Sequence, residues 1–255
     1  MSEEQHMTET QVVDALPASS IVVVRDDTCG LEVLMIERAK TMRFAPGAFV
    51  FPGGKVDARD QSETFWEGLI NCDSSLPDLS YRLAGLRELY EEASVLLTDN
   101  PVSAATTHLD FVERLKEAGA RLNVADMVPF AHWVTPEPMP RRFDTHFYIV
   151  AHNGEEACHD GNEAISLRWV RPKTILEDWD DDKVPLMFPT RLNLMKLARA
   201  STVAEALEQS READVVRTLP VIGRDSEGIK LTIDSGAGYG VTQASAKELR
   251  VETPK

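Results

Sequence analysis

The chain has 255 residues, of which 43% are hydrophobic and 27% charged, and it carries a net charge of −15. This composition is typical of a globular protein with one domain and additions, or with two domains at most. The negative charge argues against nonspecific binding to nucleic acid, whose phosphates require a basic surface. It is compatible with a small anionic substrate, because bound cations can reverse the charge locally.

The N-terminal segment and the cysteines bear on location. Residues 1–17 open with the polar, acidic stretch MSEEQHMTET, which predicts a mobile leader and argues against a secretory signal. No apolar run reaches the length of a membrane helix, so we expect no membrane partner. Cys29, Cys72 and Cys158 are scattered and odd in number, which favours free thiols in a reducing cytoplasm over disulfides or a zinc site.

The first predicted elements are two strands, at residues 21–25 and 31–37, with residues 26–30 as a hairpin loop. An apolar stretch then ends in FPGG, at Gly53 and Gly54. Adjacent glycines allow the backbone to approach a ligand closely, and a free carbonyl there can bind a metal ion.

A helix follows an irregular insert. Residues 61–79 predict one short amphipathic helix and a loop, which either cover a substrate pocket or pack on the outside of the domain. Residues 83–97 predict the main helix, with Pro77 and a cap at Asp78 or Ser80 at its start. Apolar residues recur there at intervals of three and four: Leu79, Leu83, Leu86, Tyr90, Ala93 and Leu97.

Three carboxylates share another face of this helix. Glu88, Glu91 and Glu92 fall within an arc of about 100°. Their repulsion is offset where a divalent cation binds, since carboxylate oxygens are the ligands that Mg²⁺ and Mn²⁺ prefer. Arg87 stands four residues before Glu91 and can pair with it along the helix. On the helix alone a solvated acidic face is the simpler interpretation, and the preceding FPGG favours a metal site.

These residues resemble the signature of the Nudix hydrolase family: a glycine, five residues, a glutamate, seven residues, then R-E-U-x-E-E-x-G-U, in which U is a bulky aliphatic residue. Gly54 matches the glycine and residues 87–95 match the second half. Asp60 stands at the position of the first glutamate, with roughly twenty additional residues before Arg87. Ser94 replaces the last glycine, so we expect the helix to continue to about Leu97.

Other stretches resemble the branch of the family that includes acyl-coenzyme A diphosphatases. Arg43 and Gly47 precede FPGG at the spacing of coenzyme A diphosphatases, with Ala39 in place of their serine. The long insert, W-V-T-P and R-R-F-D-T also resemble this branch. Arg141 and Arg142 are candidates for binding substrate phosphates, because arginine can bind them bidentately. The structural alternatives are a turn at Gly47 and a solvated basic pair.

The remaining predicted elements are helices at residues 103–118, 190–200 and 202–212, strands at residues 127–135, 143–152 and 165–170, and a hairpin within residues 215–233. Fraying is expected beyond Gln243. In Nudix enzymes a distal loop glutamate often completes the metal site or acts as base, and Glu163 is the first candidate, before Glu155 and Glu156. Histidines 146, 152 and 159 lack the spacing of a helical zinc pair and are expected to be structural or exposed.

The resemblance implies an α/β fold: an α/β/α sandwich around a mixed, curved sheet. We expect a leader at residues 1–17, the Nudix domain at residues 18–200, and a helical and hairpin extension at residues 201–255 with a disordered tail. The implied metal, Mg²⁺ or Mn²⁺, is held by Glu88, Glu91, Glu92 and the Gly53 carbonyl, with Arg87 orienting the carboxylates.

The implied activity is hydrolysis of a diphosphate bond, in coenzyme A or an acyl-coenzyme A, to give 3′,5′-ADP and (acyl-)phosphopantetheine. The alternatives are ADP-ribose, nucleotide sugars or dinucleotides as substrates, or a Nudix fold that only binds a ligand. The expected partner is a small diphosphate, with no nucleic acid and no membrane, and the protein is expected to be a monomer or homodimer.

Overall fold

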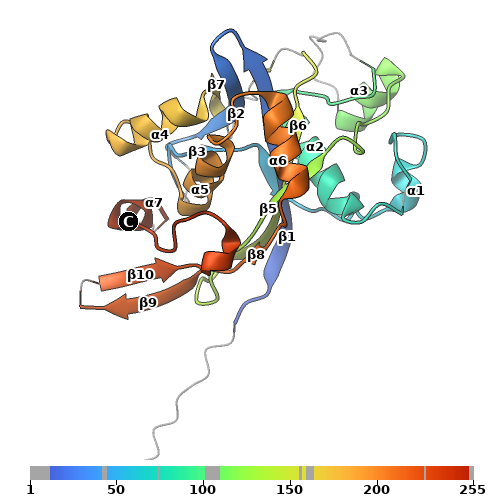
Figure 1. Ribbon diagram of the computed structural model, residues 1–255. Coiled ribbons are helices and arrows are strands. Elements are labelled where there is room, and N and C mark those ends of the chain that lie inside the picture. Colours follow the sequence, from blue (N-terminus) through green and yellow to red (C-terminus); the bar gives the residue numbers. More distant parts are fainter. Residues whose placement is uncertain are drawn as a thin grey trace, which may run out of the picture.

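The computed structural model describes residues 12–41, 45–73, 75–100, 110–154, 157–158, 164–226 and 228–252. An eight-stranded mixed sheet forms its centre, in the order β3-β2-β1-β6-β5-β8, and β4 pairs with β1 while β7 pairs with β2 (Figure 1). The strands of this sheet are β1 (Ala15–Asp27), β2 (Gly30–Arg38), β3 (Phe49–Val50), β4 (Gly53–Lys55), β5 (Val128–Val134), β6 (Arg142–Ala151), β7 (Ala164–Val170) and β8 (Arg217–Thr218).

Helices lie on both sides of the sheet. The helices are α1 (Glu63–Trp66), α2 (Leu79–Ala93), α3 (Phe111–Ala118), α4 (Pro172–Asp180), α5 (Phe188–Leu197), α6 (Val203–Glu212), the 3₁₀ turn η1 (Ser235–Ala237) and α7 (Ala246–Glu252). A separate hairpin, β9 (Val221–Asp225) with β10 (Gly228–Thr232), lies where the sequence predicts one. None of the helices in the described part of the chain combines the length and apolar character that crossing a bilayer requires.

Strand β1 separates two hydrophobic cores. Successive side chains of a strand point to opposite faces. Ile21 and Val23 are buried in the core that includes α2 and α3. Val22 and Val24 are buried in the core that includes α4, α5 and α6. The predicted α/β/α sandwich around a mixed sheet is therefore confirmed.

Helix α2 ends earlier than the sequence predicts. Its last residue is Ala93, and Ser94 takes the left-handed conformation, with φ of 56°. The Ser94 amide donates to the Tyr90 carbonyl at 2.8 Å, which closes the helix. The expected continuation to about Leu97 was wrong, because a serine here adopts the C-cap conformation that more often takes glycine. Leu96 and Leu97 are instead buried beyond the helix end.

Other boundaries also differ. Strand β1 begins at Ala15, inside the expected leader, because residues 15–24 pair in parallel with β6.

Helix α4 was not predicted, although Pro172 at its first turn is a normal start signal. Helix α7 lies where fraying was expected, and the fully buried Glu248 joins it to Arg191 of α5. The expected start of a helix at residue 103 lies outside the described residues, and α3 begins at Phe111.

The insert packs against the domain. Its helix is a single turn, α1, and Trp66 at the end of that turn is fully buried. The indole packs edge-on against Phe111 of α3, with ring centroids 5.9 Å apart. Ile70 then pairs with Leu122 in an isolated bridge. Of the two interpretations left open by the sequence, these contacts support packing on the domain.

Gly85 allows α2 to lie close to β1. A Cβ atom at this position would be 2.4 Å from Ile21 Cδ1 and 2.7 Å from Ser19 Oγ. We predict that Gly85→Ala destabilises the fold by about 1–3 kcal/mol, because overpacking outweighs the better helix propensity of alanine. Urea unfolding checks this against Gly223→Ala, whose Cβ would meet nothing within 4 Å. Equal stability of the two variants would contradict the close approach.

Candidate active site

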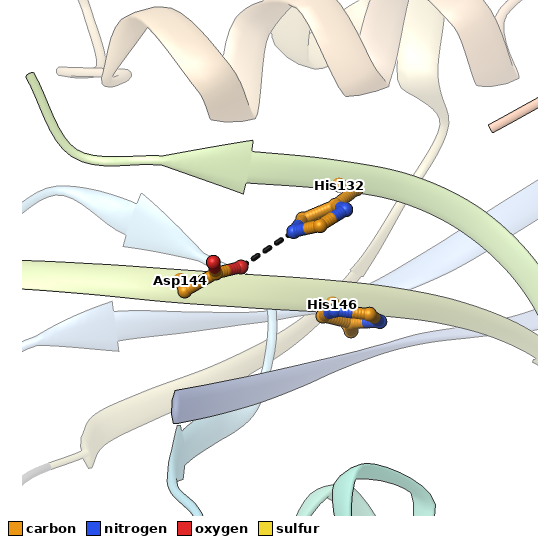
Figure 2. Close-up of side chains that lie close together, drawn as sticks. All are labelled: His132, Asp144 and His146. Atoms are coloured by element: carbon orange, nitrogen blue, oxygen red, sulfur yellow. Dashed lines mark hydrogen bonds and ion pairs between the residues drawn. The ribbon is translucent and has the colours of Figure 1, made fainter. Parts of the chain in front are cut away.

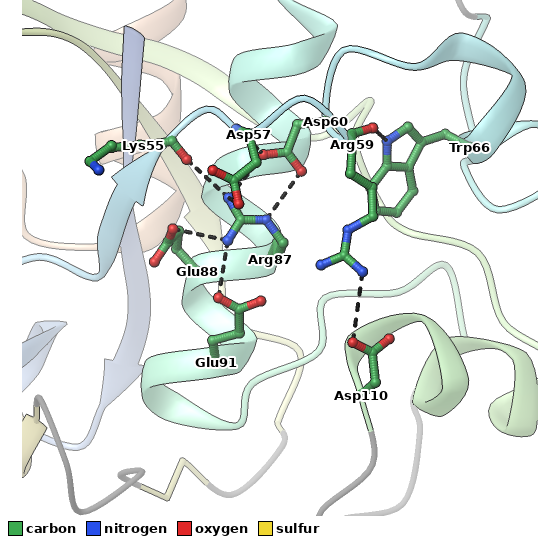
Figure 3. Close-up of polar contacts among 9 residues, drawn as sticks. All are labelled: Lys55, Asp57, Arg59, Asp60, Trp66, Arg87, Glu88, Glu91 and Asp110. Atoms are coloured by element: carbon green, nitrogen blue, oxygen red, sulfur yellow. Dashed lines mark hydrogen bonds and ion pairs between the residues drawn. The ribbon is translucent and has the colours of Figure 1, made fainter. Parts of the chain in front are cut away.

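The buried guanidinium of Arg87 is the centre of a cluster of carboxylates (Figure 3). Its side chain is 3% exposed, and Asp60 accepts from it bidentately, at 3.1 Å from Nε and 2.9 Å from Nη2. Nη1 donates to Glu88 at 2.9 Å and to Glu91 at 3.0 Å. Nη2 also donates to the Lys55 carbonyl at 2.9 Å. One side chain thus joins α2, the end of β4 and the loop after β4.

Hydrogen bonds within its own loop hold Asp60 in place beside Arg87. It is 2% exposed, and its Oδ2 accepts from the Asp57 amide at 2.9 Å, while its own amide donates to the Asp57 carbonyl. The neighbouring Arg59 carbonyl accepts from the Trp66 indole at 2.9 Å. The buried tryptophan of the insert therefore anchors the turn that presents Asp60.

Burial and charge act in opposite directions on the two central groups. Burial lowers the pKa of Arg87, but the hydrogen bond and charge of Asp60, with Glu88 and Glu91, outweigh it and raise the pKa overall. Burial raises the pKa of Glu88 above its usual 4.5, and the charge and hydrogen bond of Arg87 offset this only in part. Ionisation of Glu88 is therefore less favourable in the folded protein than in the unfolded chain.

The two glycines of FPGG contact the carboxylates of α2. The Gly53 amide donates to Glu92 Oε2 at 2.9 Å. A Cβ atom at Gly54 would lie 2.4 Å from the carboxyl carbon of Glu88, so only glycine leaves that carboxylate in place. The structure thus brings the FPGG backbone beside Glu88 and Glu92, and Glu91 joins Glu88 through Arg87.

The arginines and the distal glutamates are placed differently. Arg142 is buried, and its guanidinium donates to the carbonyls of Thr135 at 3.0 Å and Val13 at 2.7 Å. These bonds use its donors to join the start of β6 to the residue after β5 and to a residue before β1, which argues against a role in binding phosphate. Arg141 is exposed, with its guanidinium carbon 5.2 Å from the centre of the Phe143 ring. The remaining candidates, Arg43, Glu155, Glu156 and Glu163, lie outside the described residues.

Sequence reasoning did not give Asp60 a role. Its position, where the signature has a glutamate, was the available indication. Only the structure shows that its two oxygens accept hydrogen bonds from Nε and Nη2 of Arg87. Sequence reasoning also missed a second group, His132, Asp144 and His146, which strand pairing brings together. The spacing of Asp144 and His146 in a predicted strand puts them on one face, but nothing in the sequence indicates that His132 lies opposite His146.

Comparisons with known proteins agree with this geometry. The family model described as the NUDIX domain matches residues 15–188. This chain belongs to the Nudix family. It is 27% identical to the acyl-coenzyme A diphosphatase NUDT19 of Xenopus laevis, over 82% of this chain and 71% of that protein. It is 28% identical to putative nudix hydrolase 7 of Caenorhabditis elegans, over 71% of this chain and 60% of that protein.

A Nudix structure also matches the fold. The crystal structure of the Nudix hydrolase from Alicyclobacillus acidocaldarius has a TM-score of 0.62 and 27% identity, covering 76% of this chain and 96% of that one. Together with the family match, this supports assigning a hydrolase activity of the Nudix type to the chain.

The donors at this site fit a divalent ion that prefers oxygen. Glu88 and Glu91 both accept from Nη1 of Arg87, so their oxygens converge, and Glu92 is held from the side of the sheet by Gly53. One guanidinium does not neutralise Asp60 and these three glutamates. A bound divalent cation would offset the excess negative charge, and carboxylate oxygens suit Mg²⁺ and Mn²⁺.

We predict that Asp60→Asn destabilises the protein by about 3 kcal/mol, because it leaves the buried Arg87 without its bidentate anion. Urea unfolding provides the measurement. Asp57→Asn is the matched control: its side chain is 61% exposed and 3.9 Å from Arg87, so a change of no more than about 1 kcal/mol is expected. A loss of stability in the control as large as in Asp60→Asn would contradict the role given to Asp60.

Glu88→Gln is predicted to stabilise the metal-free protein at pH 7. A carboxyl group whose pKa is raised by folding destabilises the folded state while it is ionised. This penalty is present at neutral pH and disappears as the pH falls below the usual 4.5 of glutamate. Urea unfolding in EDTA at pH 7 and pH 4 should show the advantage of Glu88→Gln only at pH 7. If the wild type is more stable than Glu88→Gln at pH 7, the predicted direction of the stability change is wrong.

Proposed function

We propose that this Nudix hydrolase uses Mg²⁺ or Mn²⁺ to cleave the diphosphate bond of coenzyme A or an acyl-coenzyme A, giving 3′,5′-ADP and (acyl-)phosphopantetheine. The convergence of Glu88 and Glu91 on one nitrogen of a buried arginine carries the proposal, because it arranges the ligands of a hard cation. When bound, such an ion offsets charge on the phosphate oxygens and lowers the pKa of a water molecule.

The side chains have separate roles in this proposal. Glu88, Glu91 and Glu92, with the Gly53 carbonyl, are the ion's ligands. Arg87 positions these carboxylates and does not contact the substrate, since its guanidinium donates to protein oxygens on several sides. Glu163 is the proposed general base: it takes a proton from water as the water oxygen attacks one phosphorus, and the other phosphate leaves with the bridging oxygen.

The substrate class rests on similarity. The relatives named acyl-coenzyme A diphosphatase include the Xenopus laevis protein at 27% identity. Arg43 and Gly47 before FPGG resemble coenzyme A diphosphatases, and Arg43 and Arg141 are the proposed phosphate contacts. The scattered, odd-numbered cysteines Cys29, Cys72 and Cys158 are the basis for proposing a reducing, cytoplasmic location.

Product analysis tests the substrate. The purified protein is incubated with Mg²⁺ or Mn²⁺ and coenzyme A, two acyl-coenzyme A esters, ADP-ribose, NADH or a dinucleotide tetraphosphate, and products are resolved by mass. We predict release of 3′,5′-ADP that EDTA abolishes and added metal restores. Cleavage of another member alone would replace the substrate, and no cleavage by the folded, metal-loaded protein would favour a ligand-binding role.

A Gly54→Ala variant tests the link between backbone and carboxylate. The new methyl group displaces Glu88, and misplacement of a reacting group by about 1 Å costs on the order of 100-fold in rate. We predict a loss of this size in turnover with little change in stability, because the end of a glutamate side chain can move. Gly223→Ala, in open space, should match the wild type in both respects. Unchanged turnover in Gly54→Ala would remove Glu88 from the catalytic group.

A further inference from the structure

A second group of metal-ligating side chains lies on the β5–β6 hairpin (Figure 2). His132 of β5 is directly opposite His146 of β6, and Asp144 precedes His146 by two residues, so all three point to one face of the sheet. His132 Nε2 is 2.5 Å from Asp144 Oδ1. The two imidazole rings are 4.1 Å apart at their centroids, and candidate ligand atoms of the three residues lie within 4.8 Å of one another.

This group is distinct from the carboxylates around Arg87. His146 pairs with Ser19 of β1, and Ser19 pairs on its other side with Gly54 of β4. One strand therefore separates the histidines from the FPGG backbone. Tyr81 of α2 stacks on His146 with centroids 4.1 Å apart, and stands about two helical turns before Glu88. Both groups lie beside α2 on the same face of the sheet, but no side chain belongs to both.

We propose that His132, Asp144 and His146 form a binding site for a transition-metal ion of the Zn²⁺ type. Imidazole nitrogen with one carboxylate is a donor set that suits zinc and similar borderline ions, whereas Mg²⁺ prefers oxygen alone. The site differs in this respect from the carboxylate cluster. His132 and Asp144 are 16% and 25% exposed, so an ion can enter from solvent and water can complete its coordination.

The required movements are small. Ligand atoms about 2.1 Å from a tetrahedral ion are about 3.4 Å from one another. The His132–Asp144 hydrogen bond must therefore open by about 1 Å, and His146 must turn toward the pair. Rotations about side-chain bonds achieve this while the strands keep their register. The positive charge of Arg217 in β8 opposes the binding of a cation here, because its Nη2 lies 3.5 Å from Asp144 Oδ2.

Calorimetric titration with Zn²⁺ in excess Mg²⁺ tests the proposal. We expect the wild type to bind one Zn²⁺ per chain. His132→Gln and His146→Gln should each weaken binding more than about 100-fold, since even changes behind the ligands cost 10–100-fold. His152→Gln is the matched histidine control and should bind as the wild type does. Glu88→Gln should also retain the Zn²⁺, because the ion is not at the carboxylates.

Several outcomes would overturn the site. The wild type could fail to bind Zn²⁺ stoichiometrically, or both His132→Gln and His146→Gln could bind it with wild-type affinity. Loss of the Zn²⁺ in Glu88→Gln would also contradict the site. Circular dichroism establishes that each variant is folded. Arg217→Gln gives a readout that does not depend on losing a ligand: removing an exposed cation near Asp144 should tighten Zn²⁺ binding about fivefold. Unchanged or weaker binding there would contradict Asp144 as a ligand.

Discussion

The ion pair between Arg87 and Asp60 is the interaction on which the catalytic region depends. Both side chains are almost completely buried, so each charge requires the other to offset the loss of water. The pair fixes the loop after β4 against α2, and the remaining nitrogen of the same guanidinium turns Glu88 and Glu91 toward each other. This buried pair therefore also determines where the oxygens of the proposed metal site lie.

The second constraint is the short distance between α2 and the sheet. The helix crosses the strands so closely that a Cβ atom at Gly85 would clash with Ile21 and Ser19. A Cβ atom at Gly54 would clash with the carboxylate of Glu88. Larger residues would separate the layers or push the carboxylate away. This close packing partly buries the Glu88 carboxyl group, which raises its pKa and makes its ionisation costly to the fold. A cost of this kind is common where a site is organised for function.

Periodicity predicted most strands, and the resemblance carried by the motif implied the sandwich and the placing of FPGG beside the helix. The sequence did not predict where α2 ends, since the conformation of Ser94 depends on the surrounding packing. It offered Arg142 as a phosphate ligand, because a pair of arginines does not show which of them is buried. Nor did it show His132 beside His146, which depends on strand register.

We propose that the carboxylates oriented by Arg87 hold the catalytic ion. A crystal structure of the protein soaked with Mn²⁺, with anomalous scattering collected at the manganese edge, tests this directly. We expect an anomalous peak within coordination distance of Glu88 and Glu92, with Arg87 still bound to Asp60. A fully soaked crystal with no peak at these glutamates, or with manganese only elsewhere, would show that these carboxylates do not hold the ion.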